Sequence, residues 1–179
     1  ESIRGLLSQA NALMVDKPSL RVVNMDDALG SFFQRHTETA KYLSWPISEL
    51  NDRLYVEDGD LVLIGGYPSA GKSALSIQCA RHWARDMPVG FFSLETSPEK
   101  LMDRMMSSIA NISMHVIKRN QLTDAHWMDV VHLTKTIMEH NLEFIPAAGM
   151  GVADIRSVTQ MRGYKLIIID YVQLLSAAG

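Results

Sequence analysis

The hydrophobic pattern of the chain changes near residue 60. Before that point, apolar residues recur at helical spacing over residues 1–15 and again over 25–33, with Asp16 and Pro18 as breakers between the two stretches. After it, short apolar runs alternate with longer amphipathic segments. Strands that alternate with helices need crossover connections, so this part of the chain predicts an α/β fold whose mostly parallel sheet is covered by helices.

The individual segments predict four strands and four longer helices. The strands are expected at Leu61–Gly65 and over 89–95, 142–146 and 165–175, and the helices over 72–85, about 98–109, 123–139 and 152–162. Two helices are expected to turn apolar side chains inward. In the second helix these are Leu101, Met102, Met105, Met106 and Ile109, and in the third they are Trp127, Val130, Val131, Ile137 and Met138.

Composition narrows the class of protein. The chain has 179 residues, 47% of them apolar and 21% charged, as in ordinary globular domains. Its net charge of −3 gives no global sign of a nucleic-acid partner, although a local basic loop would be enough to bind one.

Cys79 is the only cysteine, which excludes an internal disulfide and favours a reducing, cytoplasmic compartment. No apolar run is long enough for a membrane span. Because the first residue is Glu1, we expect a piece of a longer protein.

The clearest chemical signal is the stretch GGYPSAGKSALS at residues 65–76, which matches the phosphate-binding pattern G-x-x-x-x-G-K-[ST]. An apolar run precedes it and a helical segment follows, as the motif requires. Such a loop directs backbone N–H groups and a helix N-terminus at phosphate oxygens. Lys72 is expected to reach the β- and γ-phosphates of ATP, and the hydroxyl of Ser73 to ligate Mg²⁺. The predicted nucleotide-binding residues are Gly66, Pro68, Ser69, Ala70, Gly71, Lys72, Ser73 and Ala74.

Two acidic residues follow predicted strands. Asp170 ends the run KLIIID, and Glu95 ends the run FFSLE. Ligands of open α/β sheets bind at the carboxyl edge of the strands, so both side chains are placed to act on a bound nucleotide. Asp170 is a candidate Mg²⁺ ligand, and Glu95 is a candidate catalytic residue that orients the attacking water, alongside Lys72. Glu95 would otherwise be an ordinary acid near the start of the next helix.

The segments GGYPSAGKSALS, FFSLETSPEKLMDRM and LIIIDYVQLL together resemble, in order and spacing, the motor domain of DnaB-type replicative helicases. This resemblance covers about residues 46–176. It implies a RecA-like P-loop NTPase fold preceded by an N-terminal linker helix, with residues 1–45 as linker helices and connector and 46–179 as the N-terminal part of the ATPase domain. The segment at 1–15 is similar to the linker helix that docks on an adjacent subunit.

The resemblance implies a function as well as a fold. Members hydrolyse ATP to translocate on single-stranded DNA and unwind duplexes, work as hexamers, and have a primase or a loader as partner. By position, Lys72 and Ser73 match the Walker A residues, Asp170 the Walker B aspartate, and Glu95 the glutamate that activates water. Tyr67 stands where many members carry Arg. The family's arginine finger would lie beyond residue 179, so the chain alone is expected to turn over ATP poorly, since such a finger contributes about 10³–10⁵ in rate.

Other readings of the same motif remain open at this point. A RecA- or KaiC-like recombination or regulatory ATPase would carry the same loop, although the run DYVQLL argues against it. A small-molecule kinase would need a lid with arginines and an acceptor pocket, neither of which is evident over residues 96–164. A binding or loading module would keep the loop without hydrolysing the nucleotide.

Overall fold

The computed structural model describes residues 23–37 and 41–175 and divides the chain into two compact units, residues 1–41 and 42–179. In the first unit, helix α2 (Met25–His36) confirms the second amphipathic stretch. The side chain of Asn24 caps it by accepting a 2.8 Å hydrogen bond from the backbone N–H of Asp27. The helix expected over residues 1–15 lies outside the described residues.

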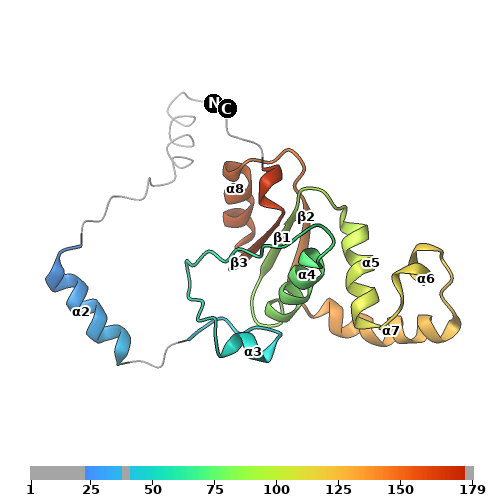
Figure 1. The fold of residues 1–179 in the computed structure, drawn as a ribbon, viewed down its shortest axis with the longest axis horizontal. Coiled ribbons are helices and arrows are strands. Elements are labelled where there is room, and N and C mark those ends of the chain that lie inside the picture. Colours follow the sequence, from blue (N-terminus) through green and yellow to red (C-terminus); the bar gives the residue numbers. More distant parts are fainter. Residues whose placement is uncertain (1–22, 38–40, 176–179) are drawn as a thin grey trace, which may run out of the picture. The chain divides into compact units, whose positions relative to one another are not determined.

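The second unit is built on a parallel sheet of three strands (Figure 1). The strands are β1 (Val89–Ser93), β2 (Leu142–Pro146) and β3 (Leu166–Asp170), in the order β2-β1-β3. β1 is central, and every one of its residues is buried. Its last residue, Ser93, pairs with Pro146 on one side and Asp170 on the other, so the three strands end in register.

Helices precede β1 and connect the described strands to one another, in keeping with the predicted alternation. Those longer than one turn are α4 (Lys72–Trp83), α5 (Pro98–Ile109), α6 (Met114–Lys118), α7 (Asp124–Met138) and α8 (Val152–Arg162). Shorter pieces are α3 (Ser48–Asn51) and a 3₁₀ turn at Val172–Leu174. Within the described ranges, no helix is long and apolar enough to cross a membrane.

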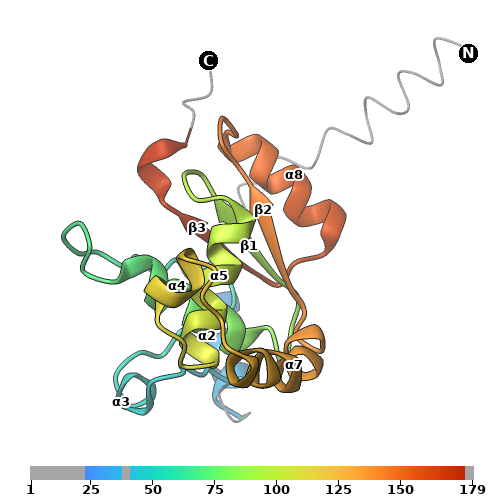
Figure 2. The same cartoon turned by 90° about the vertical axis from the view of Figure 1, so that its right-hand side faces the viewer.

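Two hydrophobic clusters cover the two faces of the sheet. Under α4 and α5, Val89 and Phe91 of β1 belong to a cluster of buried residues that includes Trp45, Trp83 and Leu101. Under α8, Phe92 packs with Leu94, Ala147 and Ile155. Figure 2 shows α8 on one side of the sheet and α4 and α5 on the other. This three-layer arrangement explains why β1 is continuously apolar, because a strand covered on both faces has no polar side.

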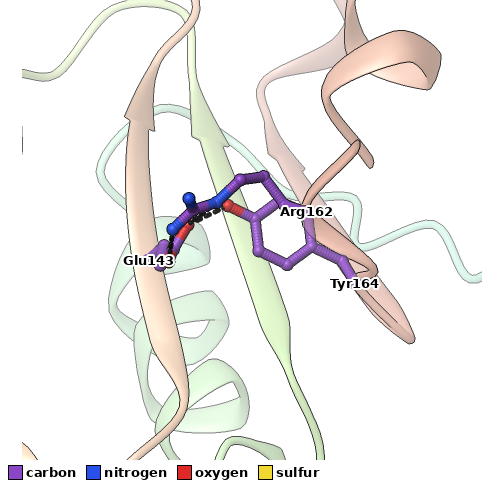
Figure 3. Close-up of polar contacts among 3 residues, drawn as sticks. All are labelled: Glu143, Arg162 and Tyr164. Atoms are coloured by element: carbon purple, nitrogen blue, oxygen red, sulfur yellow. Dashed lines mark hydrogen bonds and ion pairs between the residues drawn. The ribbon is translucent and has the colours of Figure 1, made fainter. Parts of the chain in front are cut away.

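A polar network fixes the end of α8 to the sheet (Figure 3). Glu143 of β2 accepts a 2.9 Å hydrogen bond from Nε of Arg162 at Oε2, a second bond from Nη2 of Arg162 at Oε1, and one from the Tyr164 hydroxyl at Oε2. The hydrogen bonds from Arg162 and Tyr164 lower the pKa of Glu143. Burial and the bond to Glu143 raise the pKa of Tyr164. The network therefore joins the start of β3 to β2 across the central strand.

The strand predicted at Leu61–Gly65 does not form. The segment has no secondary structure and makes no backbone hydrogen bond within the described residues, and Leu61 and Leu63 are 83% and 75% exposed. A strand requires a neighbour that satisfies its N–H and C=O groups, and among the described strands both β2 and β3 pair only with β1. The apolar run has the composition of a strand, but the prediction of a strand here is wrong.

Two inward faces were also predicted too broadly. On α7, Trp127, Val131 and Met138 are 53%, 67% and 80% exposed, whereas Val130 and Ile137 are half-buried. On α5, Leu101 and Met105 are buried but Met102 is 39% exposed. A helix on the surface of a domain buries one stripe, and the predicted sets extended around the helix beyond that stripe.

Candidate nucleotide-binding site

The phosphate-binding motif forms a tight turn directly before α4. Gly71 is the N-cap of α4 and has a left-handed backbone with φ of 94°, and Ser69 has φ of 62°. The N–H of Ala70 donates a 3.2 Å hydrogen bond to the carbonyl of Tyr67, which closes the turn. With Ser69 and Gly71 both left-handed, the backbone turns tightly, and turns of this kind form the concave backbone surfaces that bind anions. The loop is exposed from Gly65 to Gly71.

Lys72 lies across this loop. Its Nζ donates 3.0 Å hydrogen bonds to the carbonyl oxygens of Gly66 and Tyr67. The ammonium group is thereby held over the turn, where the N-terminal end of α4 adds its own partial positive charge. Ser73 follows as the second residue of α4. The loop, the lysine and the helix end thus concentrate positive potential at one exposed position.

The second group of predicted site residues lies at the carboxyl edge of the sheet. Asp170 is the last residue of β3 and is only 9% exposed. Glu95 is two residues beyond the end of β1 and is exposed. Because Ser93 pairs with Asp170, and the N–H of Leu94 donates a 2.9 Å hydrogen bond to the carbonyl of Asp170, both acids belong to the same edge of the sheet.

The start of α4 lies at this same end of the sheet. The chain leaves the C-terminal end of α4 at Trp83 and enters β1 at Val89, so the helix runs antiparallel to the strands. In Figure 1 the first turn of α4 and the carboxyl ends of the strands lie at one end of the domain. α4 therefore begins at the end of the layer arrangement where β1 and β3 finish.

Sequence reasoning missed one polar residue of this edge. Ser93 is 3% exposed, and its Oγ accepts a 3.1 Å hydrogen bond from the N–H of Thr96, on the far side of Glu95. A serine inside an apolar run gives no signal of its own, because only the hydrogen bond from Thr96 shows that its hydroxyl takes part in the turn.

A phosphate-binding turn before a helix, with acids at or just beyond the carboxyl ends of two neighbouring parallel strands, is typical of a RecA-like P-loop ATPase domain. The model of the DnaB-like helicase C-terminal domain family matches residues 47–179, and the chain belongs to this family. The family resemblance expected from the motifs is confirmed.

Curated relatives are replicative DNA helicases. The chain is 29% identical over 126 residues to the replicative DNA helicase DnaC of Bacillus subtilis, which covers 67% of this chain and 28% of the relative. It is 27% identical over 178 residues to the replicative DNA helicase DnaB of Nostoc, covering 92% of this chain and 20% of the relative. The chain thus spans less than a third of the length of these relatives.

Solved structures agree on the fold. A solved ATPase domain superposes with a TM-score of 0.75 at 25% identity, covering 89% of this chain and 61% of that one. A DnaB-like replicative helicase, studied with its primase interactions, superposes with a TM-score of 0.76 at 23% identity, covering 99% of this chain and 45% of that one. Both likenesses confirm the expected RecA-like α/β fold.

Proposed function

We propose that this chain is the ATP-binding motor segment of a hexameric replicative DNA helicase, which hydrolyses ATP to translocate on single-stranded DNA and unwind duplex. Two observations support the proposal: Lys72 spans the turn before α4, and the register of β1 with β3 brings Asp170 and the turn that carries Glu95 to one edge of the sheet. Membership in the DnaB-like family supports it over a RecA- or KaiC-like regulatory ATPase.

In this proposal the loop binds the triphosphate. Backbone N–H groups of Ser69, Gly71 and their neighbours contact phosphate oxygens at the start of α4, and the Ala70 N–H joins them by giving up its bond to the Tyr67 carbonyl. Lys72 exchanges its hydrogen bonds with the carbonyls of Gly66 and Tyr67 for bonds to the β- and γ-phosphates. Its charge then offsets the negative charge that develops during phosphoryl transfer. Pro68 lies within the loop, and Ala74 follows it in the first turn of α4.

The donor set at the site fits Mg²⁺. Ser73 offers a hydroxyl oxygen and Asp170 a largely buried carboxylate, and oxygen donors are those that Mg²⁺ prefers. Within the described ranges, no group of three or more His, Cys, Asp or Glu side chains could hold a metal by itself. Two protein donors that rely on phosphate oxygens for the rest suit an ion that is bound together with its nucleotide. When bound, Mg²⁺ would neutralise charge on the phosphate oxygens.

Glu95 is proposed to act on the attacking water. Its carboxylate is exposed and makes no hydrogen bond within the described part of the chain, so it is available to a water beside the γ-phosphate. There it would orient that water in line and accept its proton. Asp170, which is buried, takes the metal instead. The different burial of the two acids is what separates their proposed roles.

The partners belong to the proposal too. Single-stranded DNA, further copies of the chain in a hexamer, and a primase or loader are expected, and the similar helicase structure was studied with its primase interactions. We place the protein in the cytoplasm, where its lone thiol, Cys79, stays reduced.

The proposal is tested by comparing ATP hydrolysis and ATP binding in the parent and in Glu95→Gln. We expect Glu95→Gln to bind Mg²⁺-ATP as the parent does but to hydrolyse it about 10²–10⁴ times more slowly, the usual contribution of a general base. Glu99→Gln, which removes another exposed carboxylate near the same turn, should hydrolyse at the parent rate. Equal hydrolysis by Glu95→Gln and the parent would contradict the proposal and favour a module that binds without hydrolysis.

A further inference from the structure

Glu95 is placed by the two residues that flank it. The turn between β1 and α5 is short: β1 ends at Ser93 and α5 begins at Pro98. A glutamate on such a turn would sample many positions if the backbone on both sides were free, and catalysis by a positioned base needs a defined geometry. The structure holds the backbone on each side of Glu95 by a different hydrogen bond.

The first bond lies before Glu95. The N–H of Leu94 donates a 2.9 Å hydrogen bond to the carbonyl of Asp170, which continues the pairing of β1 with β3 by one residue. The Leu94 side chain is 6% exposed and packs in the cluster under α8. The backbone entering Glu95 is therefore tied to the residue that we propose as the metal ligand.

The second bond lies after Glu95 and depends on a side chain. Oγ of Ser93 accepts a 3.1 Å hydrogen bond from the N–H of Thr96. Ser93 is 3% exposed at the end of the fully buried central strand, so its hydroxyl has a fixed position. The side-chain bond brings Thr96 back toward β1, and Glu95 is left at the apex between the two anchored residues.

We propose that Ser93 is a positioning residue for Glu95: its hydroxyl holds the turn so that the backbone carrying the Glu95 carboxylate stays at a fixed place at the edge of the sheet where β3 ends. This inference rests on the proposed function, in which Glu95 acts on the attacking water. Ser93 itself contacts neither nucleotide nor water in this role, and it belongs to a different element from the phosphate-binding Lys72 and Ser73.

Removal of the hydroxyl should therefore affect the chemical step and leave substrate binding intact. For Ser93→Ala we expect the maximal rate of ATP hydrolysis to fall about 10- to 100-fold, because a displacement of about 1 Å costs on that order. The half-saturating concentration should stay that of the parent. Ser93→Thr keeps an acceptor oxygen at the same position and should recover most of the rate.

The assay is single-turnover hydrolysis of Mg²⁺-ATP with the full 179-residue chain in excess, a format that detects slow reactions. The matched control is Ser107→Ala, which removes a serine hydroxyl that donates a 2.6 Å hydrogen bond to the carbonyl of Ile112 at the opposite end of α5. It should hydrolyse at the parent rate. Thermal melts by circular dichroism identify any variant that has lost its fold. If Ser93→Ala has lost its fold, the hydrolysis rate of Ser93→Thr is compared with that of the parent instead.

A double-mutant cycle distinguishes positioning from a general structural effect. If Ser93 acts through Glu95, Ser93→Ala should slow the parent but not slow Glu95→Gln further, because coupled residues are not additive. An unchanged rate in Ser93→Ala, or equal slowing by it in both backgrounds, would overturn the inference while leaving the proposed function intact. Absence of any Lys72-dependent hydrolysis in the parent would instead contradict the proposed function, and the positioning role with it.

Discussion

The ring of Tyr164 lies directly over Gly90, at the second position of the central strand. A Cβ built on Gly90 would come within 2.6 Å of two ring carbons of Tyr164. Gly90 pairs with Glu143 on β2, the residue whose carboxylate accepts the Tyr164 hydroxyl bond. The missing side chain at Gly90 thus lets the tyrosine cross β1 and reach β2.

This relationship predicts the effect of a methyl group at Gly90. Gly90→Ala should lower the free energy of unfolding by about 1–3 kcal/mol, the usual cost of overpacking a core. Gly65→Ala is the matched control, because a Cβ there meets nothing within 4 Å. Chemical denaturation of both variants measures the difference. A Gly90→Ala variant as stable as Gly65→Ala would show that the ring moves aside at no cost.

The same network predicts a dependence of stability on pH. The bonds from Arg162 and Tyr164 lower the pKa of Glu143 in the folded state, so its ionised form stabilises the fold at pH values above its unfolded pKa of about 4.3. That contribution is lost as the pH falls through the lowered folded value. We expect Glu143→Gln to be less stable than the parent at neutral pH, and the gap to narrow below about pH 4. Denaturation midpoints across pH test this, and a gap that is constant with pH would contradict it.

The two glycines of the phosphate-binding motif should respond differently to alanine. Gly71 has φ of 94°, where an L-residue is strained by about 1–2 kcal/mol, whereas a Cβ on Gly66 would meet Ala70 and Lys72 at ordinary contact distances of 3.5–3.8 Å. We therefore expect Gly71→Ala to unfold at lower denaturant than Gly66→Ala. Equal midpoints would mean that the loop adopts another backbone at Gly71.

Cys79 provides a probe of the core under α4. The thiol is fully buried, and burial raises its pKa to about 11. Because the thiolate is the reactive form, the native protein should react very slowly with a thiol reagent near pH 8, and unfolding should make the reaction fast. The measurement is the reaction rate with and without denaturant. Fast labelling of the native chain would contradict the packing of α4 against β1.

Much of the α/β domain could be predicted from sequence because local pattern determines it. Three strands, and the helices α4, α5, α7 and α8, begin close to where the apolar periodicity placed them, and Asp170 ends its strand. The strand expected to continue to residue 175 was predicted too long, because Val172–Leu174 form a 3₁₀ turn. The failures share a cause. The run at Leu61–Gly65 has strand composition, but strand formation depends on a neighbour that composition does not specify. The prediction that Trp127 is buried failed for the same reason, since the burial of a helix face depends on what lies opposite it.

The contacts that position the site could not be predicted from the sequence either. Ser93 and Thr96 are three residues apart, yet their bond matters only because β1 ends in register with β3. The contact between Gly90 and Tyr164 joins residues far apart in the chain and arises from a glycine that carries no motif. Motif residues could be found from their spacing, whereas the residues that hold them depend on tertiary contacts.

The most direct test of the account is a titration of the chain with a fluorescent ATP analogue and Mg²⁺, in the parent and in Lys72→Ala. Lys135→Ala, which removes an exposed lysine on α7, is the control. We predict that the parent and the control bind alike, and that Lys72→Ala binds about ten- to hundredfold more weakly, because a hydrogen bond to a charged group contributes about 1.5–3 kcal/mol. Binding by Lys72→Ala equal to that of the parent would contradict the assignment of the loop as the nucleotide site.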